Sequence, residues 1–266
     1  MNYVLLLTAC INPDGMPYTQ LSDKDERLRQ YFFAIDFYLQ STNLPIIFVE
    51  NSNTDISKNY SSQIQKGRLE VITFDGNHDK KRGKGYGEAN IIEQAMIHST
   101  HITEDCIVVK ITGRLIVNNI IQVLKKLFPL QQGRSVNCSF HSDMMFADSR
   151  FFCAPPSFLR YLTSHKDKMN DSEGVFFEHV LAECTKTSNI PNYPFWTEPS
   201  IIGVSGTNGE IYTKNDNSPL YKLNYRLFVL HQAIIFCKNS DKYPYICSWY
   251  FKILYVLHIF LKFIIE

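Results

Sequence analysis

The chain has 266 residues, with 27 Lys and Arg against 26 Asp and Glu, so its formal net charge is +1. This balance indicates no nucleic-acid partner, since domains that bind nucleic acid are typically strongly basic. Apolar residues make up 45% of the chain and charged residues 20%, a composition that excludes extended disorder and can fill a hydrophobic core. The length suits one α/β domain, or one domain with an appendage.

Four continuous apolar runs predict buried β-strands, at residues 3–9, 45–50, 69–74 and 105–111. The first run is too short for the apolar core of a signal peptide. A helix is expected between the first two strands. Its predicted N-cap is Ser22, and its apolar positions recur every three or four residues, at Leu28, Phe32, Ile35 and Leu39.

Strands and helices therefore alternate over the first 115 residues, which predicts a parallel, Rossmann-like sheet. Ligands of such sheets bind beyond the carboxyl ends of the strands. The second half has less regular features: an aromatic strand over 144–152, a helix that begins near Asp171, and a glycine-rich loop over 205–212. The stretch 205–209 is either a backbone nest for phosphate or a tight turn.

A basic, glycine-rich segment over residues 80–88 (KKRGKGYGE) is the clearest candidate for an anion site. Glycines let the backbone approach a ligand closely, and a following helix offers free N–H groups at its N-terminus. Lys84 adds a positive charge. A solvated basic loop is the alternative, because the spacing fits neither a Walker loop nor a dinucleotide fingerprint.

The seven cysteines contain no CxxC pair and are odd in number, which favours buried, reduced thiols in a cytosolic protein over a disulfide framework or a zinc site. They are Cys10, Cys106, Cys138, Cys153, Cys184, Cys237 and Cys247.

The order of the motifs resembles glycosyltransferases of the GT-A fold. The acidic loop DDGSTD of that family corresponds to residues 50–55 (ENSNTD), and its loop and helix ARNxGLxxA correspond to 85–95 (GYGEANIIEQA). The strand that carries the family's DxD metal motif ends here in VKITGR, residues 109–114. The resemblance covers roughly residues 1–235, and KITGR, FADSRFF and SGTNGEIY resemble more specifically the bacterial capsule and lipopolysaccharide glycosyltransferases.

This resemblance implies an α/β fold, with a GT-A-like, Rossmann-type mixed sheet flanked by helices. The domain is expected over 1–238, with a nucleotide-sugar-binding half at 1–115 and an acceptor half at 116–238. The donor is expected to contact the ends of the first four strands and the glycine-rich loop. These contacts are Thr8, Ala9, Glu50, Asn51, Ser52, Lys84, Gly85, Tyr86, Gly87, Lys110, Thr112, Gly113 and Arg114.

The chain departs from the family at the DxD position, where no carboxylate follows the strand. A DxD motif holds a divalent ion that neutralises the leaving diphosphate. Lys110 and Arg114 stand there instead, and a guanidinium can contact two phosphate oxygens. We therefore expect a metal-independent site without a cofactor. Arg114 pairing with a structural carboxylate is the alternative, and Asp143 and Asp148 leave metal binding open.

An inverting transfer needs a base for the acceptor hydroxyl, and the family places an acidic residue at the start of a late helix. Glu173 is the corresponding candidate, with Asp143 next and with Glu178 and His179 as weaker ones. An acidic residue at a helix N-terminus also has a purely structural explanation, which fits Asp171 equally well.

The C-terminal stretch 243–266 is almost entirely apolar and aromatic, but Lys252, His258 and Lys262 fall on one side of a helix. Charges in its middle disfavour a membrane-spanning helix and favour an amphipathic helix in the membrane interface. A helix packed on the domain or in a dimer is the alternative. Residues 239–266 are therefore predicted to associate with a membrane.

The predicted protein is a glycosyltransferase on the cytoplasmic, inner face of a bacterial membrane. It would move a sugar from a nucleotide-sugar, by family frequency a UDP-sugar, to a lipid-linked or oligosaccharide acceptor of a surface polysaccharide. The alternatives are a nucleotidyltransferase and a non-catalytic, membrane-associated module that binds sugar nucleotides.

Overall fold

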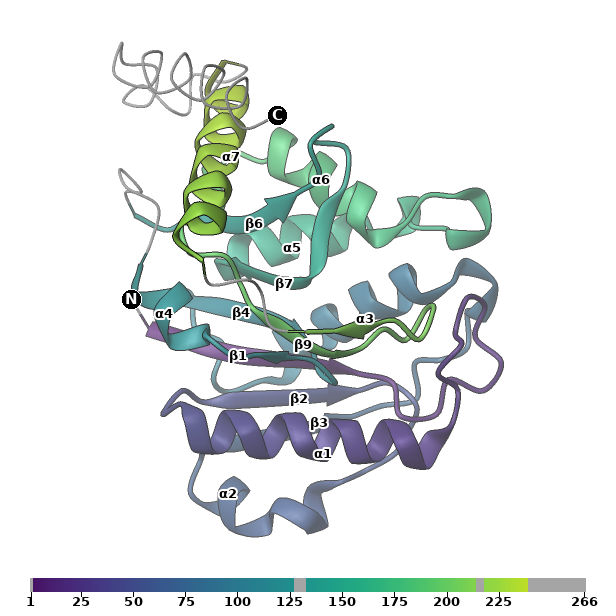
Figure 1. Ribbon diagram of the computed structural model, residues 1–266. Helices are drawn as coiled ribbons and strands as arrows, with labels where there is room; N and C mark the ends of the chain where they lie inside the picture. The colour runs from purple at the N-terminus through teal and green to yellow at the C-terminus, as the bar shows by residue number, and fades with distance from the viewer. Residues whose placement is uncertain (1, 127–132, 214–217, 239–266) are drawn as a thin grey trace.

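The computed structural model describes residues 2–126, 133–213 and 218–238. A seven-stranded sheet runs through the molecule in the order β3-β2-β1-β4-β7-β6-β8 (Figure 1). Its strands are β1 (Asn2–Ala9), β2 (Ile46–Glu50), β3 (Leu69–Thr73), β4 (Cys106–Thr112), β6 (Val136–Phe140), β7 (Ala147–Ala154) and β8 (Asn192–Tyr193). The first four are mutually parallel and β7 is antiparallel to β4 and β6, so the predicted mixed α/β sheet is confirmed.

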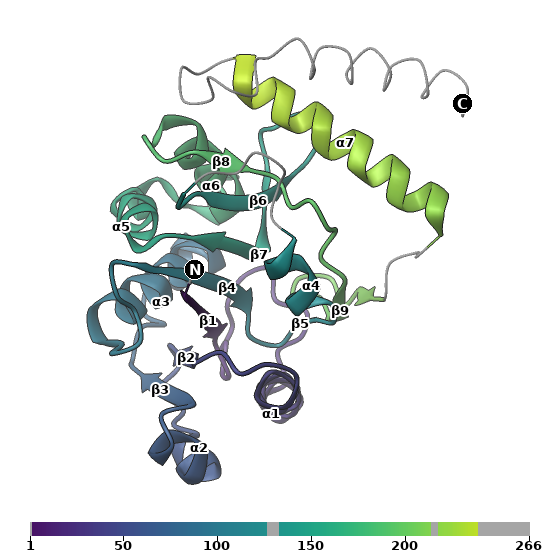
Figure 2. The ribbon, with the colours of Figure 1, turned by 90° about the vertical axis from the view of Figure 1, so that its left-hand side faces the viewer.

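Helices and a small second sheet cover the two faces of the large sheet (Figure 2). One face carries α3 (Lys84–His98), α5 (Pro156–Ser164) and α6 (Phe177–Thr187). The other carries α1 (Lys24–Ser41), α4 (Ile120–Lys125) and the sheet β10-β9-β5, with β5 (Ile116–Val117), β9 (Ile201–Val204) and β10 (Ile211–Tyr212). The short α2 (Ser61–Gln65) follows β2, and α7 (Pro219–Lys238) ends the described part of the chain.

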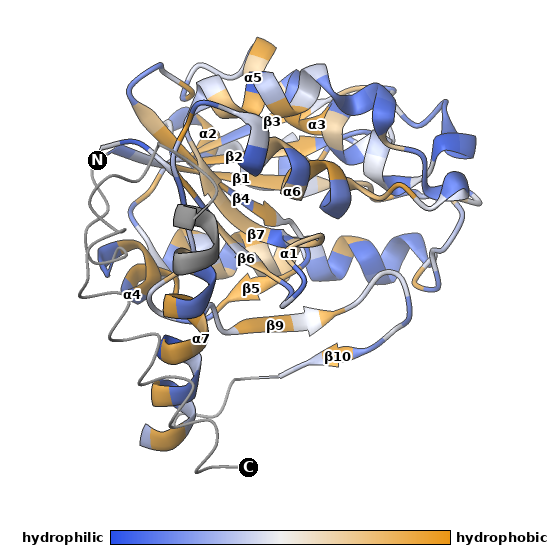
Figure 3. Cartoon of the chain, turned by 90° about the horizontal axis from the view of Figure 1, so that it is seen from above, coloured by the Kyte–Doolittle hydropathy of each residue, from blue (hydrophilic) through white to orange (hydrophobic). Residues whose placement is uncertain are grey.

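Each face of the large sheet has its own hydrophobic core, because successive residues of a strand point to opposite faces. Val4 and Leu6 of β1 pack on the side of α3, whereas Leu5 and Leu7 pack on the side of α1. Figure 3 shows the central strands as a hydrophobic band between helices with polar outer surfaces. Burial on both faces explains why these strands are continuous apolar runs in the sequence.

Two helix boundaries differ from the sequence prediction. The N-cap of α1 is Asp23 rather than Ser22, because the Asp23 carboxylate accepts the backbone N–H of Glu26 at 2.7 Å. The helix expected from Asp171 begins only at Phe177. A 3₁₀ turn over Asp171–Glu173 precedes it, and Gly174 in the left-handed conformation separates the two.

The sheet reverses its strand order between β1 and β4, which are neighbours although β2 and β3 separate them in the chain. This is a topological switch point, where open α/β sheets bind ligands at the carboxyl ends of their strands. Ile111 near the end of β4 pairs with Phe151 of the antiparallel β7. The start of β7 therefore lies at the same edge of the sheet as the carboxyl ends of β1 and β4. Residues from both predicted halves of the domain therefore meet there.

None of the described helices combines the length and apolarity needed to cross a bilayer. The predicted membrane-associating segment, residues 239–266, lies outside the described residues. The division of the domain into halves at residue 115 stays a prediction.

Candidate functional site

The carboxyl ends of β1 and β4 approach each other closely at the switch point. The Gly113 N–H donates to the carbonyl of Thr8 at 2.9 Å. A Cβ at Gly113 would lie 2.8 Å from that oxygen and within 3.3 Å of the Tyr31 ring, so only glycine fits without a shift. Thr8 and Gly113, two of the predicted donor contacts, are thus adjacent.

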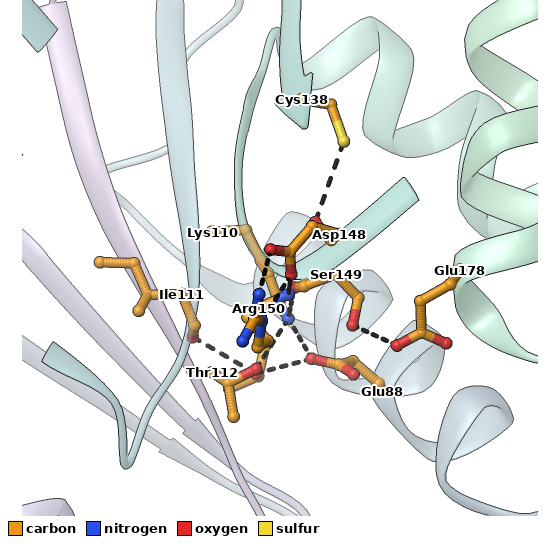
Figure 4. A network of polar contacts seen from close by, with 10 residues as sticks. Glu88, Lys110, Ile111, Thr112, Cys138, Asp148, Ser149, Arg150 and Glu178 are labelled. Carbon is orange, nitrogen blue, oxygen red and sulfur yellow. Dashed lines mark hydrogen bonds and ion pairs between the residues drawn. The ribbon is translucent and has the colours of Figure 1, made fainter. Parts of the chain in front are cut away.

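A buried ion pair lies beside them (Figure 4). Lys110 of β4 is fully buried, and its ammonium pairs with a carboxylate oxygen of Glu88 in the first turns of α3. The same oxygen accepts the Thr8 hydroxyl at 3.1 Å, and the ammonium also donates to the Ser149 carbonyl at 2.5 Å. Glu88 keeps 21% of its side chain exposed, so the pair has one accessible side.

A second carboxyl, that of Glu178, lies on the other side of Ser149. The Ser149 hydroxyl donates to Glu178 at 2.5 Å, and Glu178 stands in the first turn of α6. Burial raises the pKa of Glu178 above its ordinary value, and the hydrogen bond from Ser149 opposes this only in part. A carboxyl whose pKa is raised toward neutrality is suited to general acid–base catalysis.

The glycine-rich start of α3 is held by an acidic residue of the chain itself. Asp171 accepts the backbone N–H groups of Lys84 at 2.7 Å and Gly85 at 3.4 Å. Burial raises the pKa of Asp171, and these two bonds counteract it. Gly83 has φ +89° and ψ −172°, a conformation essentially confined to glycine. The predicted anion site at these N–H groups therefore already has an acceptor.

Lys84 joins three loops at the rim of the site. Its ammonium donates to the carbonyl of Tyr18 at 2.6 Å and to the Thr207 hydroxyl at 2.7 Å. Partial burial lowers its pKa, and Asp171 and Glu178 are among the charges that oppose this effect. The guanidinium of Arg82 lies over the Tyr86 ring, 4.1 Å from the ring centre. Lys84 and Arg82 of the glycine-rich segment thus make contacts within the protein, and its role as an anion site stays a prediction.

Glu50, a predicted donor contact, is buried, and its carboxylate accepts hydrogen bonds from the loops after β1 and β2. Its carboxylate accepts the backbone N–H groups of Ile11 and Ser52, both at 2.9 Å, and of Thr54 at 2.8 Å. The Ser52 hydroxyl donates to it as well. Glu50 thus fixes the loop after β1 against the loop after β2, and Ala9 bonds the second loop through its carbonyl.

Arg114 is only 8% exposed, so it does not present an open guanidinium. It donates to the carbonyl of Val204 at 2.9 Å and to the side chain of Gln30 at 3.2 Å, and burial lowers its pKa. Among the described residues it has no carboxylate partner within salt-bridge distance. Its role at a diphosphate stays a prediction.

Several buried polar atoms at this edge of the sheet lack a hydrogen-bond partner among the described residues. Buried polar groups are normally paired, so a group of exceptions in one region calls for an explanation, and a bound ligand is one. The atoms are Asn51 Oδ1, Thr73 Oγ1, Asn77 Oδ1, Arg114 Nε and Asp171 Oδ1. Asn51, Thr73 and Arg114 stand within two residues of the ends of β2, β3 and β4.

Glu173 and Asp143, the two predicted catalytic residues, are exposed and stand apart from this network. Glu173 lies on the 3₁₀ turn before α6, where its backbone N–H bonds the Asn170 carbonyl. Asp143 lies in the β6–β7 turn and accepts the backbone N–H of Met145 at 2.9 Å. Asp148 pairs with Arg150 at 2.7 Å. The described ranges contain no group of three or more His, Cys, Asp or Glu residues placed to hold a metal ion.

Sequence reasoning missed Glu88 and Ser149 and ranked Glu178 low. One signal was present: Lys110 is the only charged residue in the apolar run 106–111. A lysine in a strand buried on both faces needs a carboxylate partner. The sequence does not say which carboxylate, because that depends on how α3 packs on β4.

No protein-family model matches the sequence, and no curated protein sequence matches it. Solved structures do show a likeness. The glycosyltransferase GlyE of Streptococcus pneumoniae TIGR4 aligns with 73% of this chain at 13% identity and a TM-score of 0.46, and the match spans 46% of the GlyE chain. A cytidylyltransferase from Leptospira borgpetersenii aligns with 91% of this chain and 98% of its own, at 14% identity and a TM-score of 0.42.

The inositol-1-phosphate CTP transferase of T. maritima aligns with 84% of this chain at 11% identity and a TM-score of 0.45. At such identities and TM-scores the likeness carries no argument about function, which has to be argued from the residues of the site.

Proposed function

We propose that the chain is a glycosyltransferase that takes a sugar from a nucleotide-sugar and transfers it, with inversion, to an acceptor hydroxyl. The observation that carries this proposal is the pair of carboxyls, Glu88 and Glu178, on either side of Ser149 at the switch point of the sheet. One of them, Glu178, has a raised pKa and no cationic partner within salt-bridge distance among the described residues.

Glu178 is the proposed general base. It would take the proton of the acceptor hydroxyl as that oxygen attacks the anomeric carbon of the donor, while the nucleoside diphosphate leaves. The role predicted for Glu173 passes to Glu178 because Glu178 stands in the first turn of α6 and faces the network. Ser149 fixes the orientation of its carboxyl, and Lys110 holds Ser149 through its carbonyl.

The nucleotide is proposed to lie over the ends of β1, β2 and β4, where the buried atoms of Asn51 and Arg114 lack partners. The leaving diphosphate would then lie nearest to Lys84 at the rim and to the buried Arg114, whose Nε lacks a partner among the described residues. Cationic side chains can stabilise the developing charge of a leaving phosphate. We therefore expect donor binding in EDTA, with no cofactor, and a larger loss of affinity for UDP than for uridine in Arg114→Ala.

The acceptor is proposed to be a glycan or lipid-linked glycan of a bacterial surface polysaccharide, reached from the cytoplasmic face of the membrane. Residues 239–266 would associate the enzyme with that surface. Truncation before Tyr243 should move the protein to the soluble fraction while donor binding persists. If the shortened protein aggregated or lost nucleotide binding, the proposed membrane association of residues 239–266 would be contradicted.

A thermal-shift series with UDP, GDP, CMP and dTDP compounds tests the proposal. A ligand that binds only the folded state at a hundred times its Kd stabilises by about 2.7 kcal/mol, which is readily detected. Stabilisation by a nucleoside diphosphate and its sugar conjugate, followed by turnover with an acceptor, supports sugar transfer. Stabilisation by CTP with release of pyrophosphate would indicate a nucleotidyltransferase, and binding without turnover would indicate a non-catalytic module.

A further inference from the structure

Three cations lie together at the carboxyl edge of the sheet, and one of them, Arg27 of α1, has no part in the site described so far. Arg27 and Arg114 are 6% and 8% exposed. Tyr31 accepts a hydrogen bond from Arg27 at 3.4 Å and also hydrogen-bonds Arg114. Burial lowers the pKa of Arg114 and of Lys84, and the charge of Arg27 lowers both further. Arg27 is therefore close to both of the other cations.

Among the described residues, none of these three cations has a carboxylate within salt-bridge distance. Arg27 donates to the carbonyls of Cys10 at 2.7 Å and Leu21 at 2.9 Å. The other two cations likewise bond carbonyl, amide or hydroxyl oxygens. Lys110 and Arg150, elsewhere at the large sheet, are each paired with a carboxylate. Since buried charges are normally paired, the cluster of three cations calls for a negative charge from outside the chain.

The cluster also keeps a hydrogen-bond donor for such a ligand. Arg114 Nε is buried and has no partner in the described part of the chain. A buried N–H without a partner is unusual, and a bound acceptor would satisfy it. Around the two guanidiniums, Cys10, Lys84 and Gly206 each keep part of their surface exposed, so the cluster is open to solvent at its rim.

The turn between β9 and β10 lies against the two guanidiniums. A Cβ at Gly206 would lie 2.5 Å from Arg114 Nη2 and 3.8 Å from Arg27 Nη1. Two backbone N–H groups of the turn donate to the Ser205 hydroxyl, at 3.3 and 3.4 Å. Of the two alternatives for residues 205–209, the structure therefore favours the tight turn. Because these N–H groups already have an acceptor, an anion at this place would be bound chiefly by side chains.

We infer that Arg27, Arg114 and Lys84 together bind a diphosphate group, and that Arg27 contacts it beside both of the other cations. A guanidinium bonds two phosphate oxygens at once, and a lysine adds a point charge. A diphosphate has enough charge and enough oxygens to contact all three cations. The inference rests on the proposed function, which already places a diphosphate near two of these cations, and it adds Arg27 as a third.

Calorimetric titration of the full-length protein with inorganic pyrophosphate tests this without any nucleotide. We expect pyrophosphate to bind more tightly than orthophosphate. Arg27→Gln should weaken pyrophosphate binding roughly tenfold, the equivalent of about 1.4 kcal/mol. Arg68→Gln is the matched control, because Arg68 also donates to backbone carbonyls, those of Thr42 and Leu44 at 2.8 Å, but at the other end of α1. Both variants should lower the unfolding temperature, and only Arg27→Gln should lower the affinity.

Gly206→Ala tests the same cluster with all three charges kept. Gly206 does not have a positive φ, so its backbone accepts alanine, but the added Cβ has to displace the Arg114 guanidinium. Pyrophosphate affinity should therefore fall several-fold. This variant also decides the matter if Arg27→Gln does not fold.

The diphosphate of a nucleotide-sugar and the diphosphate of a lipid carrier share the chemistry that the cluster recognises. Displacement of pyrophosphate by a nucleoside diphosphate would identify the donor as its source, and displacement by a lipid diphosphate alone would identify the carrier of the acceptor. Both results support the inference. No binding of pyrophosphate, equal losses of affinity in Arg27→Gln and Arg68→Gln, or unchanged affinity in Gly206→Ala would overturn it. Arg27-dependent binding of pyrophosphate without any sugar transfer would instead overturn the proposed function alone.

Discussion

One carboxylate oxygen of Glu88 accepts both the Thr8 hydroxyl and the Lys110 ammonium, and so joins the ends of β1 and β4 to the first turns of α3. The Lys110–Glu88 ion pair therefore lies at the point in the sheet where the strand order reverses. Because Lys110 is fully buried and Glu88 is only 21% exposed, removing either partner leaves the other with an uncompensated, largely buried charge.

Replacing Lys110 by Met should therefore destabilise the protein by about 3–5 kcal/mol, the usual loss when one partner of a buried pair is removed. Chemical denaturation measures it. The double variant Lys110→Met with Glu88→Gln should recover a large part of the loss, because the unpaired charge is gone. A loss below about 1 kcal/mol in the single variant would mean that the pair has little energetic importance.

Glu178→Gln should lower the transfer rate by about 10²–10⁴-fold while donor affinity stays near that of the wild type, because a general base acts on the acceptor hydroxyl and not on the nucleotide. Steady-state kinetics and calorimetric titration of the donor separate the two effects. Glu173→Gln is the matched control, with an exposed carboxyl five residues earlier. If Glu173→Gln were inactive and Glu178→Gln active, the base would be the residue predicted from the sequence.

The same substitution, Glu178→Gln, should raise the free energy of unfolding at pH 7–8. The pKa of Glu178 is raised in the folded state, chiefly by burial, so the folded protein binds this proton more tightly than the unfolded chain does. The stability contributed by the protonated form is present below the unfolded pKa and is lost as pH rises through the folded pKa. Glu178→Gln should then be more stable than the wild type at pH 7–8, and this advantage should vanish near pH 4.

Unfolding curves at several pH values measure this difference, and a gain of 1 kcal/mol corresponds to roughly 2–4 °C in Tm for a domain of this size. The acid limb of the transfer rate should also lie above the ordinary range of a glutamate. If Glu178→Gln were less stable than the wild type at pH 8, the ionised carboxylate would be stabilising. That result would contradict a raised pKa of Glu178 in the folded protein.

Gly83→Ala should reduce both stability and donor affinity. A Cβ at Gly83 would lie 2.3 Å from the Asp171 carboxylate, so the cap of α3 has to move. Gly67→Ala is the control, since Gly67 also has a positive φ, +66°, but no atom within 4 Å of the added Cβ. The control should lose about 1–2 kcal/mol from the left-handed backbone alone. Equal losses in the two variants would exclude a specific role of the Gly83–Asp171 contact.

The parallel half of the fold could be predicted from the sequence because its strands are buried on both faces. The four apolar runs correspond to β1, β2, β3 and β4 within one or two residues at each end. The small sheet of β5, β9 and β10 could not be predicted in this way. Two of its strands, β5 and β10, have only two residues. β5 pairs with β9 across more than 80 residues of sequence, as in the pair Ile116↔Ile202.

The candidate site was predictable only in its location. Thr8, Lys110 and Gly113 lie at or near the ends of β1 and β4, a position that follows from the predicted strands; their part in donor binding stays a prediction. Their partners were not predictable, because Glu88 and Ser149 reach Lys110 through the packing of α3 and β7 on β4. The same limit applies to Asp171, which caps α3 across 87 residues of sequence.

Identification of the phosphate product tests the central claim most directly. The protein is incubated with a nucleotide-sugar that stabilises it and with an acceptor glycan, and the released species is identified by ³¹P NMR. The account predicts release of the nucleoside diphosphate, one for each sugar transferred, in the wild type and its near-absence in Glu178→Gln. Release of pyrophosphate from a nucleoside triphosphate and a sugar phosphate, or undiminished transfer by Glu178→Gln, would contradict it.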